Sequence, residues 1–488
     1  MNESATRQQL RFLLNGESVE LTSVPPTLTL LEWLRRERGL TGTKEGCAEG
    51  DCGACSVVIA EPAGDSLRYR SVNACIVFLA TLDAKAVITV EYLSQFGSLH
   101  PVQRNLVDQH ASQCGFCTPG IAMSLFARVQ NRDDGPLEDT LAGNLCRCTG
   151  YGPILDAANA VDSDFALAMF EPQHQHMRAA LAELKHTDHI ALSHPDGLFF
   201  APSNASELAT LLQQHPEATL LGGGTDVGLW VTKQHRSLPV VISTARLAGL
   251  DRVTRNAGWL EIGAACAYSD ALDALSTLHP TFNSLVRRIG SRQIRNTGTV
   301  VGNIANGSPI GDMPPALIAL GASVVLESTA GTREIALEDF FLDYGVQAID
   351  AGEFVRAIQI PPLDSHAKVA CYKISKRFEQ DISAVSAGFY LTLDRDGVVS
   401  EARLAFGGMA ATPRRATRTE AALRGNVFNE SAVIAALPSL HADFTPLSDW
   451  RASKAYRQTV AGNLLRKFAR EVATGSAVDL WPASSTAP

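Results

Sequence analysis

The chain has 488 residues, which is enough for roughly three or four domains. With 45% hydrophobic and 19% charged residues it has the composition of a globular protein, and no uninterrupted apolar run approaches the ~18 residues that span a bilayer. A net charge of -9 argues against a nucleic-acid-binding surface, so the expected partners are proteins and small molecules, with no nucleic acid and no membrane.

Residues 7–92 predict a small mixed β-sheet domain with one helix. The segments LRFLLNG and VEL are apolar runs on either side of a turn signal, so they predict a hairpin. A helix is expected from Leu28 to Arg38, because Gly39 is a typical stop signal. A cysteine-containing loop follows and is expected at the edge of the sheet.

Eight of the ten cysteines fall between Cys47 and Cys148 and divide into two sets of four. The first set has the spacing with which plant-type ferredoxins hold a [2Fe–2S] cluster. Small residues such as Gly50 and Gly53 lie between its members, and they let backbone amides approach the cluster sulfurs. Structural zinc is the nearest alternative, although a zinc ribbon more often has two CxxC pairs. The first set comprises Cys47, Cys52, Cys55 and Cys75.

Residues 93–165 predict an all-helical domain that carries the second set. The helical pattern begins near Pro101, and GIAMSLFARVQ follows a Cys-Thr-Pro-Gly segment in which Pro119 suits the first turn of a helix. On spacing alone, both a second [2Fe–2S] cluster and structural zinc remain open. Helix N-termini at the site would help to hold its negative charge. The second set comprises Cys114, Cys117, Cys146 and Cys148.

Disulfides are the remaining alternative for both sets. The N-terminal sequence MNESATRQQLRF lacks the apolar stretch of a secretory signal, so we expect a cytoplasmic, reducing location. In that location the thiolates would stay available as soft metal ligands.

Residues 166–195 are expected to form a linker between modules. The segment 171–194 holds five of the twelve histidines, and a metal site is the alternative interpretation. No histidine pair has a carboxylate or cysteine ligand to support it, so a solvated linker or an exposed helix is favoured.

Two polar loops in residues 196–366 indicate a ligand that contains phosphate. The first, here called the glycine loop, is Gly222 to Asp226, and it follows a predicted strand that ends at Leu221. Its bare amides can approach a pyrophosphate closely, although a tight turn alone would also explain it. The second, here called the polar loop, runs from Asn296 to Asp312. Together they suggest a long ligand with a diphosphate at its centre; Ser308 is not in a GxSxG motif, so a hydrolase is discounted.

The order of these motifs resembles the xanthine dehydrogenase family of molybdenum hydroxylases over nearly the whole chain. The motifs are the two cysteine sets followed by GGGTD and TVVGNIANGSPIGD. The resemblance implies a multidomain α+β fold. Its parts would be a β-grasp ferredoxin-like domain, an all-helical [2Fe–2S] domain, a vanillyl-alcohol-oxidase-type FAD-binding α+β domain at 196–366, and a C-terminal α/β flavoprotein domain at 367–475. Two [2Fe–2S] clusters, ligated by the eight cysteines, and one FAD would be the cofactors.

The resemblance also implies which residues contact FAD. The glycine loop would surround the pyrophosphate, the polar loop would follow the ribityl and phosphate groups, and the last two residues below would lie at the ring system. No catalytic residue is implied on this chain. The implied contacts are Leu220, Leu221, Gly222, Gly223, Gly224, Thr225, Asp226, Val227, Gly298, Thr299, Gly302, Asn303, Asn306, Asp312, Val355 and Lys373.

Two positions differ from the family's pattern. Residue 289 is isoleucine where animal relatives often carry an aromatic side chain, and the loop Arg377–Asp381 lacks the doubly basic, strongly acidic run. The choice between NAD and oxygen as electron acceptor therefore stays open.

The fusion of iron–sulfur and flavin modules without anything further resembles the small subunit of two-subunit bacterial members of the family. It implies that hypoxanthine or xanthine is oxidised to urate at a molybdopterin centre on a larger partner chain. Electrons would pass through the helical-domain cluster, then the ferredoxin-like cluster, to FAD and on to NAD. A heterotetramer with two of each chain is expected. The alternatives are a subunit of a molybdenum hydroxylase for aldehydes or N-heterocycles, and a stand-alone NADH:acceptor reductase.

Overall fold

The computed structural model describes residues 6–94 and 97–476. Residues 1–5, part of the N-terminal segment considered above, and residues 95–96 of the predicted helical domain lie outside the described residues. The chain divides into two compact units, which are described separately. The first is Met1–Ala248 with Gly290–Gly298, and the second is Gly249–Ile289 with Thr299–Pro488.

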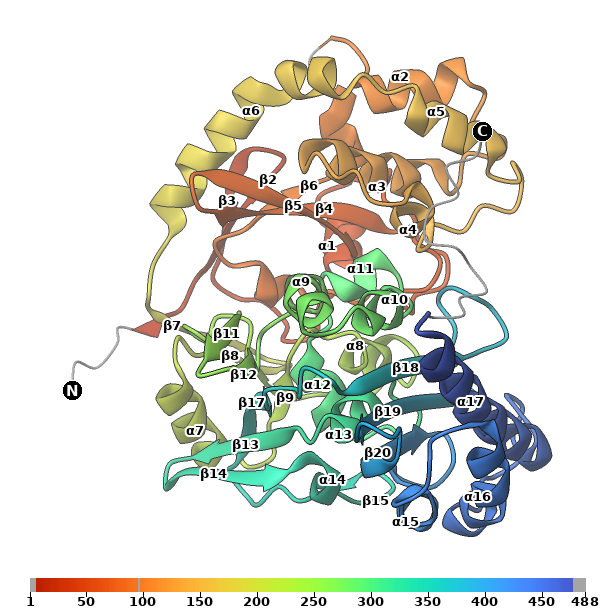
Figure 1. Ribbon diagram of the computed structural model, residues 1–488. Helices are drawn as coiled ribbons and strands as arrows, with labels where there is room; N and C mark the ends of the chain where they lie inside the picture. Colours follow the sequence, from red (N-terminus) through yellow and green to blue (C-terminus); the bar gives the residue numbers. More distant parts are fainter. Residues whose placement is uncertain (1–5, 95–96, 477–488) are drawn as a thin grey trace. The chain divides into compact units, whose positions relative to one another are not determined.

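The first unit begins with a five-stranded mixed sheet in the order β3-β2-β6-β4-β5 (Figure 1). The predicted hairpin is confirmed as β2 paired antiparallel with β3. The predicted helix is confirmed in shorter form as α1, whose N-cap Thr29 accepts a hydrogen bond from the Glu32 amide. We call this the ferredoxin-like domain. Its elements are β2 (Leu10–Leu14), β3 (Glu17–Leu21), α1 (Leu30–Arg36), β4 (Ser56–Ala63), β5 (Ser66–Asn73), η1 (Leu79–Leu82) and β6 (Ala86–Ile88).

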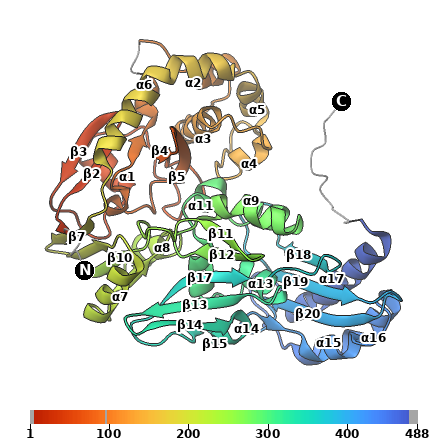
Figure 2. The ribbon, with the colours of Figure 1, turned by 60° about the vertical axis from the view of Figure 1, so that its left-hand side comes forward.

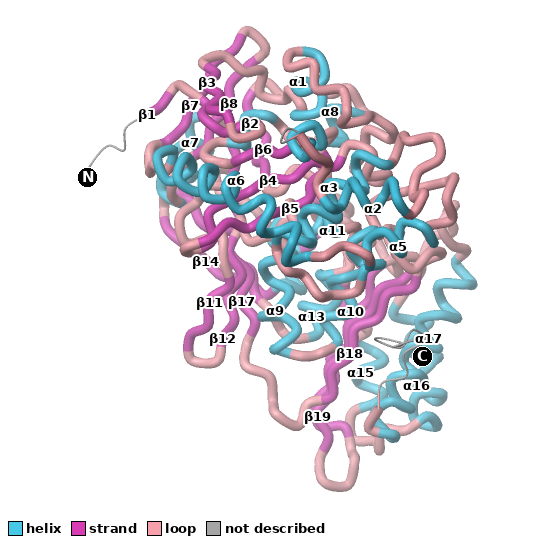
Figure 3. The backbone as a smooth tube through the Cα atoms, turned by 90° about the horizontal axis from the view of Figure 1, so that it is seen from above, coloured by secondary structure: helices cyan, strands magenta, loops and turns pink. Residues whose placement is uncertain are grey.

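Helices follow, as predicted, and α3 packs on strands β4 and β5. Pro119 lies in the first turn of α3, where its missing amide costs no helical hydrogen bond. Figure 3 shows α2, α3 and α5 gathered together, and α2 contacts both of the others. The elements of this helical domain are η2 (Val90–Ser94), α2 (Pro101–Asp108), α3 (Thr118–Gln130), α4 (Leu137–Leu141), α5 (Gly152–Asn159) and α6 (Ser163–Leu184).

Much of the segment expected as a linker is the long helix α6, visible in yellow in Figure 1. It is more than a solvated connection, because Phe170, Met177 and Leu181 are buried in a core shared with the ferredoxin-like strands and α3. Its histidines are used locally: His174 lies 2.8 Å from the Tyr69 hydroxyl, and His176 contacts the Gly16 carbonyl. In the described part of the chain, these histidines belong to no group of three His, Cys, Asp or Glu side chains placed to hold a metal ion.

The first unit also contains the first part of the region expected to bind flavin. A sheet in the order β1-β7-β8-β10-β9 shares one core with the ferredoxin-like domain, which joins Phe12 and Leu30 with Phe199 and Leu221. This continuous core explains why the boundary between the units falls after Ala248 rather than at the predicted linker. The elements are β1 (Thr6–Arg7), β7 (His189–His194), β8 (Gly197–Ala201), α7 (Ala205–Gln214), β9 (Thr219–Leu221), α8 (Val227–Thr232), β10 (Val240–Ser243) and the short helix α11 (Arg292–Arg295).

The second unit has two larger sheets, in the orders β11-β12-β17-β13-β14 and β18-β19-β20-β21. Figure 2 labels their strands, apart from β21. The buried helix α13 contacts β19 and β20, and α17 covers β19. The first group comprises β11 (Val253–Asn256), β12 (Trp259–Gly263), α9 (Tyr268–Leu278), α10 (Thr281–Arg287), α12 (Val300–Ala305), α13 (Met313–Ala319), β13 (Ser323–Ser328), β14 (Gly331–Ala336), α14 (Leu337–Phe340), β15 (Phe341–Asp343), β16 (Val346–Gln347) and β17 (Phe354–Ile360). The C-terminal group comprises β18 (Lys368–Ile374), β19 (Val385–Leu393), β20 (Val399–Gly407), β21 (Arg414–Arg415), α15 (Thr417–Leu423), α16 (Glu430–Asp443) and α17 (Lys454–Thr474).

Throughout residues 6–94 and 97–476, no helix combines the length and apolar character that a bilayer crossing requires. The multidomain α+β class predicted from the sequence is confirmed.

Candidate redox centres and flavin loops

The first cysteine set comes together in the loop between α1 and β4 and just after β5. The Cys47 sulfur accepts hydrogen bonds from the Asp51 and Cys52 amides at 3.4 and 3.3 Å. Hydrogen bonds from the Cys52 and Cys75 side chains lower the pKa of Cys47, and the pKa of Cys75 is raised first by Cys47 and then by Cys55. Side-chain hydrogen bonds therefore link the four sulfurs in the order Cys52, Cys47, Cys75, Cys55.

The second set gathers at the start of α3 and in the loop before α5. The Cys114 and Cys148 sulfurs lie 3.5 Å apart and are exposed. Burial first, and then the Cys146 side chain, raise the pKa of Cys117 to about 12, which places these two sulfurs side by side. This set forms the two pairs Cys114/Cys148 and Cys117/Cys146.

Tyr151 fixes the loop that carries Cys146. Its hydroxyl accepts a hydrogen bond from the Cys146 amide at 2.8 Å and donates to the Asn144 carbonyl at 3.2 Å. The cysteine spacing gave no sign of this tyrosine, which keeps a left-handed backbone with φ 68° just before α5.

Four neighbouring cysteine sulfurs in each set fit a [2Fe–2S] cluster, because a cluster of this type is held by four thiolates. Within the described residues, none of the eight cysteines of the two sets forms a disulfide. The other two cysteines, Cys266 and Cys371, are buried in the second unit and belong to neither set.

The two cysteine loops contact each other directly. The Leu145 amide donates to the Cys52 carbonyl at 2.9 Å, and the Asn144 side chain donates to the Gly53 carbonyl at 3.2 Å. Gly53 has φ +69°, and a Cβ there would lie 1.9 Å from the Gly143 carbonyl oxygen. Only glycine allows this approach, so the loops are matched in shape at backbone level.

The first cysteine loop also contacts the region of the glycine loop. A Cβ at Gly228 would lie 2.8 Å from the Cβ of Ile76, the residue after Cys75. The Thr232 hydroxyl donates to the Ala48 carbonyl at 2.7 Å, next to Cys47. Helix α8, which begins at Val227 directly after the glycine loop, is therefore packed on the first cysteine loop.

The structure places the glycine loop beside the start of the polar loop, within the first unit. Leu220 and Leu221 end strand β9, as predicted, and the glycine loop follows. A Cβ at Gly223 would lie 1.9 Å from the Thr297 carbonyl oxygen, and one at Gly298 would lie 3.3 Å from the Thr225 hydroxyl oxygen. Close packing of backbone on backbone requires the glycine at 223.

The rest of the polar loop forms part of the second unit. Thr299 caps α12 by accepting the Gly302 amide at 2.9 Å, and Asn306 ends the helix. The Asn303 side-chain oxygen is buried and has no hydrogen-bond partner among the described residues. A buried oxygen of this kind fits a site that a polar ligand completes.

Asp312 and Lys373 form a buried ion pair of 2.6 Å in the second unit. The Ser383 hydroxyl donates to Asp312 at 2.5 Å. Tyr268 is 3% exposed, and its hydroxyl has no hydrogen-bond partner within residues 6–94 and 97–476. Burial, and then Asp312, raise the pKa of Tyr268 well above the usual value. Ser383 and Tyr268 were missed at the level of sequence, because neither lies in a recognisable motif. Val355 lies in β17 and is buried at 4% exposure.

Arg288 holds the loop Arg377–Asp381. Its guanidinium lies 4.5 Å from the Phe378 ring centre and donates to the Phe378 and Lys373 carbonyls. Arg288 thus connects the loop Arg377–Asp381 to β18, the strand that carries Lys373.

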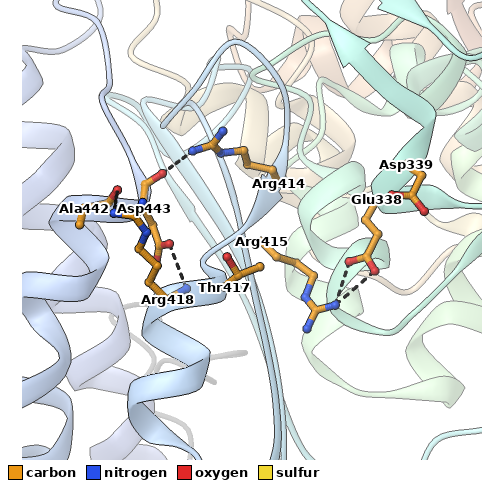
Figure 4. A pocket seen from close by; sticks show the side chains of 8 residues that line it. All are labelled: Glu338, Asp339, Arg414, Arg415, Thr417, Arg418, Ala442 and Asp443. Atoms are coloured by element: carbon orange, nitrogen blue, oxygen red, sulfur yellow. Dashed lines mark hydrogen bonds and ion pairs between the residues drawn. The ribbon is translucent and has the colours of Figure 1, made fainter.

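A cavity of about 450 Å³ in the second unit contains no predicted site residue (Figure 4). Its charges largely satisfy one another: Arg415 pairs with Glu338, and Asp443 accepts the Arg418 and Thr419 amides. The charged side chains that line the cavity therefore stabilise the packing of the elements around it.

Family models match four successive parts of the chain. They are a "2Fe-2S iron-sulfur cluster binding domain" at residues 12–80, a "[2Fe-2S] binding domain" at 89–159, an "FAD binding domain in molybdopterin dehydrogenase" at 192–363, and a "CO dehydrogenase flavoprotein C-terminal domain" at 370–472. The predicted cofactors, two [2Fe–2S] clusters and FAD, are confirmed by these matches.

Curated relatives include the xanthine dehydrogenase of Emericella nidulans, 32% identical over 95% of this chain and 38% of the relative. The xanthine dehydrogenase/oxidase of Gallus gallus is 30% identical over 87% of this chain and 37% of the relative. The chain thus spans well under half the length of these relatives.

Similar solved structures include a carbon monoxide dehydrogenase from Hydrogenophaga pseudoflava, which lacks the Mo-pyranopterin moiety of its molybdenum cofactor. It is 27% identical with a TM-score of 0.54, over 57% of this chain and 98% of that chain. The reconstituted CO dehydrogenase of Oligotropha carboxidovorans is 28% identical with a TM-score of 0.53, over 57% and 97%.

Proposed function

Since the chain belongs to the molybdenum hydroxylase family and carries its iron–sulfur and FAD-binding domains, we propose that it is the electron-transfer part of a xanthine dehydrogenase. Hypoxanthine or xanthine would be oxidised to urate at a molybdopterin centre on a larger partner chain. Electrons would then pass through the two clusters to FAD and on to NAD. The working assembly would be a heterotetramer with two of each chain, in the cytoplasm.

The observation that carries this proposal is the order of contacts within the first unit. The second cysteine loop contacts the first through Leu145 and Cys52, and the first contacts the glycine-loop region through Ile76 and Gly228. The helical-domain cluster, the ferredoxin-like cluster and FAD would therefore follow one another. Exposed Cys114 and Cys148 suit the entrance, because a partner's donor could approach them.

The ligands proposed for the ferredoxin-like cluster are Cys47, Cys52, Cys55 and Cys75, and those for the helical-domain cluster are Cys114, Cys117, Cys146 and Cys148. Amides that donate to Cys47 would stabilise the negative sulfur and so tune the reduction potential. The glycine loop would hold the pyrophosphate of FAD. Within the second unit, Thr299 to Asp312 of the polar loop and Lys373 would be further flavin contacts. The Asn303 oxygen, which has no hydrogen-bond partner among the described residues, supports this. FAD supplies an acceptor that takes electrons singly and releases a hydride to NAD.

Oxidation of another substrate by the same arrangement is the second candidate. It is favoured by the two CO dehydrogenases among the similar structures, whose identity of 27–28% is only slightly below that of the xanthine dehydrogenases. The substrate would be set by the partner chain, so it does not alter the roles proposed for this chain. A stand-alone NADH:acceptor reductase has no such structural observation in its favour.

Co-purification from the native host tests the proposal. We expect a larger molybdenum-containing chain to accompany this one, and the complex to convert xanthine to urate with reduction of NAD. The chain alone should carry both clusters and FAD and oxidise NADH with an artificial dye, without turning over xanthine. Xanthine turnover by the chain alone would contradict the division of labour, and a complex inactive on purines would favour the second candidate.

A further inference from the structure

Gln293 lies in α11, within the segment Gly290–Gly298 that belongs to the first unit although the residues before and after it belong to the second. Its side chain is fully buried, at 0% exposure. A polar amide in such a position needs hydrogen-bond partners, because an unpartnered one would be costly.

The partners of Gln293 come from both iron–sulfur domains. Its side-chain nitrogen lies 3.2 Å from the Ser56 hydroxyl, 3.2 Å from the Ser124 hydroxyl and 3.0 Å from the Asn144 side-chain oxygen. Ser56 directly follows the predicted ligand Cys55, and Asn144 lies two residues before the predicted ligand Cys146. One side chain therefore contacts the supports of both cysteine loops.

These partners also bond one another. The Ser124 hydroxyl donates to the Asn144 oxygen at 2.7 Å, and Asn144 in turn donates to the Gly53 carbonyl at 3.2 Å. The Gly53 carbonyl lies between the predicted ligands Cys52 and Cys55. The network thus runs from α11 through the second cysteine loop into the first.

Helix α11 is itself held on both domains. Arg292 pairs with Asp139 of the helical domain at 3.0 Å, and Asn296 donates to the Ser71 carbonyl of the ferredoxin-like sheet at 2.9 Å. These contacts hold α11 in place, so the position of Gln293 depends on the helix as well as on its own hydrogen bonds.

We propose that Gln293 is a positioning residue for electron transfer between the two clusters. It keeps the two cysteine loops at a fixed separation and orients the polar groups beside them, and thereby sets the difference between the two cluster potentials. The proposal rests on the proposed function for the direction of flow. In each transfer one electron moves from the helical-domain cluster to the ferredoxin-like cluster, so the first is oxidised as the second is reduced.

Redox titration of the purified full-length chain, followed by electron paramagnetic resonance, tests this role without any substrate. In Gln293→Met the length of the side chain is kept but its donors are lost. We expect the equilibrium constant for electron transfer between the two clusters to change by about tenfold. This corresponds to a change of ~59 mV in the difference between the two one-electron reduction potentials. We also expect a changed magnetic interaction between the reduced clusters.

Ser291→Ala is the matched control, because it removes the hydroxyl that caps the same helix by accepting the Ile294 amide, without touching the network. It should leave both potentials unchanged. Equal shifts in the two variants would overturn the proposal in favour of general packing of α11. Unchanged potentials in Gln293→Met with full iron content would overturn it as well.

If Gln293→Met loses iron, Ser124→Ala decides, because it removes one partner from the network and leaves only a small space. A shift in the same direction would support the proposal, and unchanged potentials would contradict it. Absence of both cluster signals from the unaltered chain would instead contradict the cofactor assignment on which the proposed function depends.

Discussion

Cys148 and Cys114 are the most exposed members of the two cysteine sets, and their sulfurs lie 3.5 Å apart. The two sets are separate in sequence, and the sulfurs of each set contact other members of the same set. A change in one set should therefore leave the other cluster assembled.

We predict that Cys148→Ala abolishes one of the two electron paramagnetic resonance signals of the reduced chain and halves its iron content. The signal of the ferredoxin-like cluster should persist. Cys371→Ala, which alters a buried cysteine outside both sets, should keep both signals. Loss of both signals in Cys148→Ala would show that the two sets are not independent sites.

Lys373 has a structural task that can be separated from flavin contact. Its ammonium group is the buried partner of Asp312. Lys373→Met would leave that carboxylate uncompensated, at a cost of about 3–5 kcal/mol. We predict a lower denaturation midpoint and reduced FAD content, measured by urea titration and flavin absorbance.

Lys376→Met is the control for this variant. The exposed Lys376 side chain donates to the Trp450 carbonyl, so its loss should change the midpoint little. A Lys373→Met chain as stable as the unaltered one would contradict the importance of the buried pair.

The cysteines and the glycine loop could be found from the sequence because their chemistry depends on local spacing. The roles of Gln293 and Ser383 could not be predicted, because their hydrogen-bond partners lie 60 or more residues away along the chain. Tyr268 could not be predicted either, because no motif surrounds it. Buried polar contacts of this kind depend on tertiary packing. Isolated glutamine, serine and tyrosine residues carry no periodic signal.

At the scale of elements, α6 shows how packing overrides composition. Its histidines and polar residues predicted a linker, yet Phe170 is 2% exposed, with its ring centre 4.9 Å from that of Phe126. Four apolar side chains spaced along 22 residues are enough to bury one face of the helix. The amphipathic stripe was too sparse to stand out from the sequence.

We predict that Phe170→Ala costs about 3–5 kcal/mol, because it empties an aromatic site in the core. Loss of cluster absorbance should then occur at a lower urea concentration. Phe165→Ala in the same helix, whose ring is 62% exposed, should change the midpoint by no more than about 0.5 kcal/mol. Equal effects of the two variants would show that α6 is not packed as described.

At the scale of the whole molecule, the order of the domains was predictable from the order of the motifs. The division of the chain into its two compact units was not. The segment Gly290–Gly298 lies within the first unit because α11 bonds to both iron–sulfur domains. Because Gly290–Gly298 belongs to the first unit, the start of the polar loop lies beside the glycine loop. The second cysteine loop contacts the first, and the first contacts the region of the glycine loop. These contacts determine the order of the centres in the proposed electron path.

That sequence of centres is tested most directly by delivering electrons at the flavin and following each cluster by rapid-freeze electron paramagnetic resonance. Illumination with EDTA reduces the flavin without NADH or a partner chain. In Cys75→Ala, checked for an intact helical-domain cluster by its oxidised spectrum and iron content, that cluster should stay oxidised for much longer than in the unaltered chain. In Cys148→Ala the ferredoxin-like cluster should be reduced at the unaltered rate. Reduction of the helical-domain cluster at an unchanged rate in Cys75→Ala would contradict the path through the ferredoxin-like cluster.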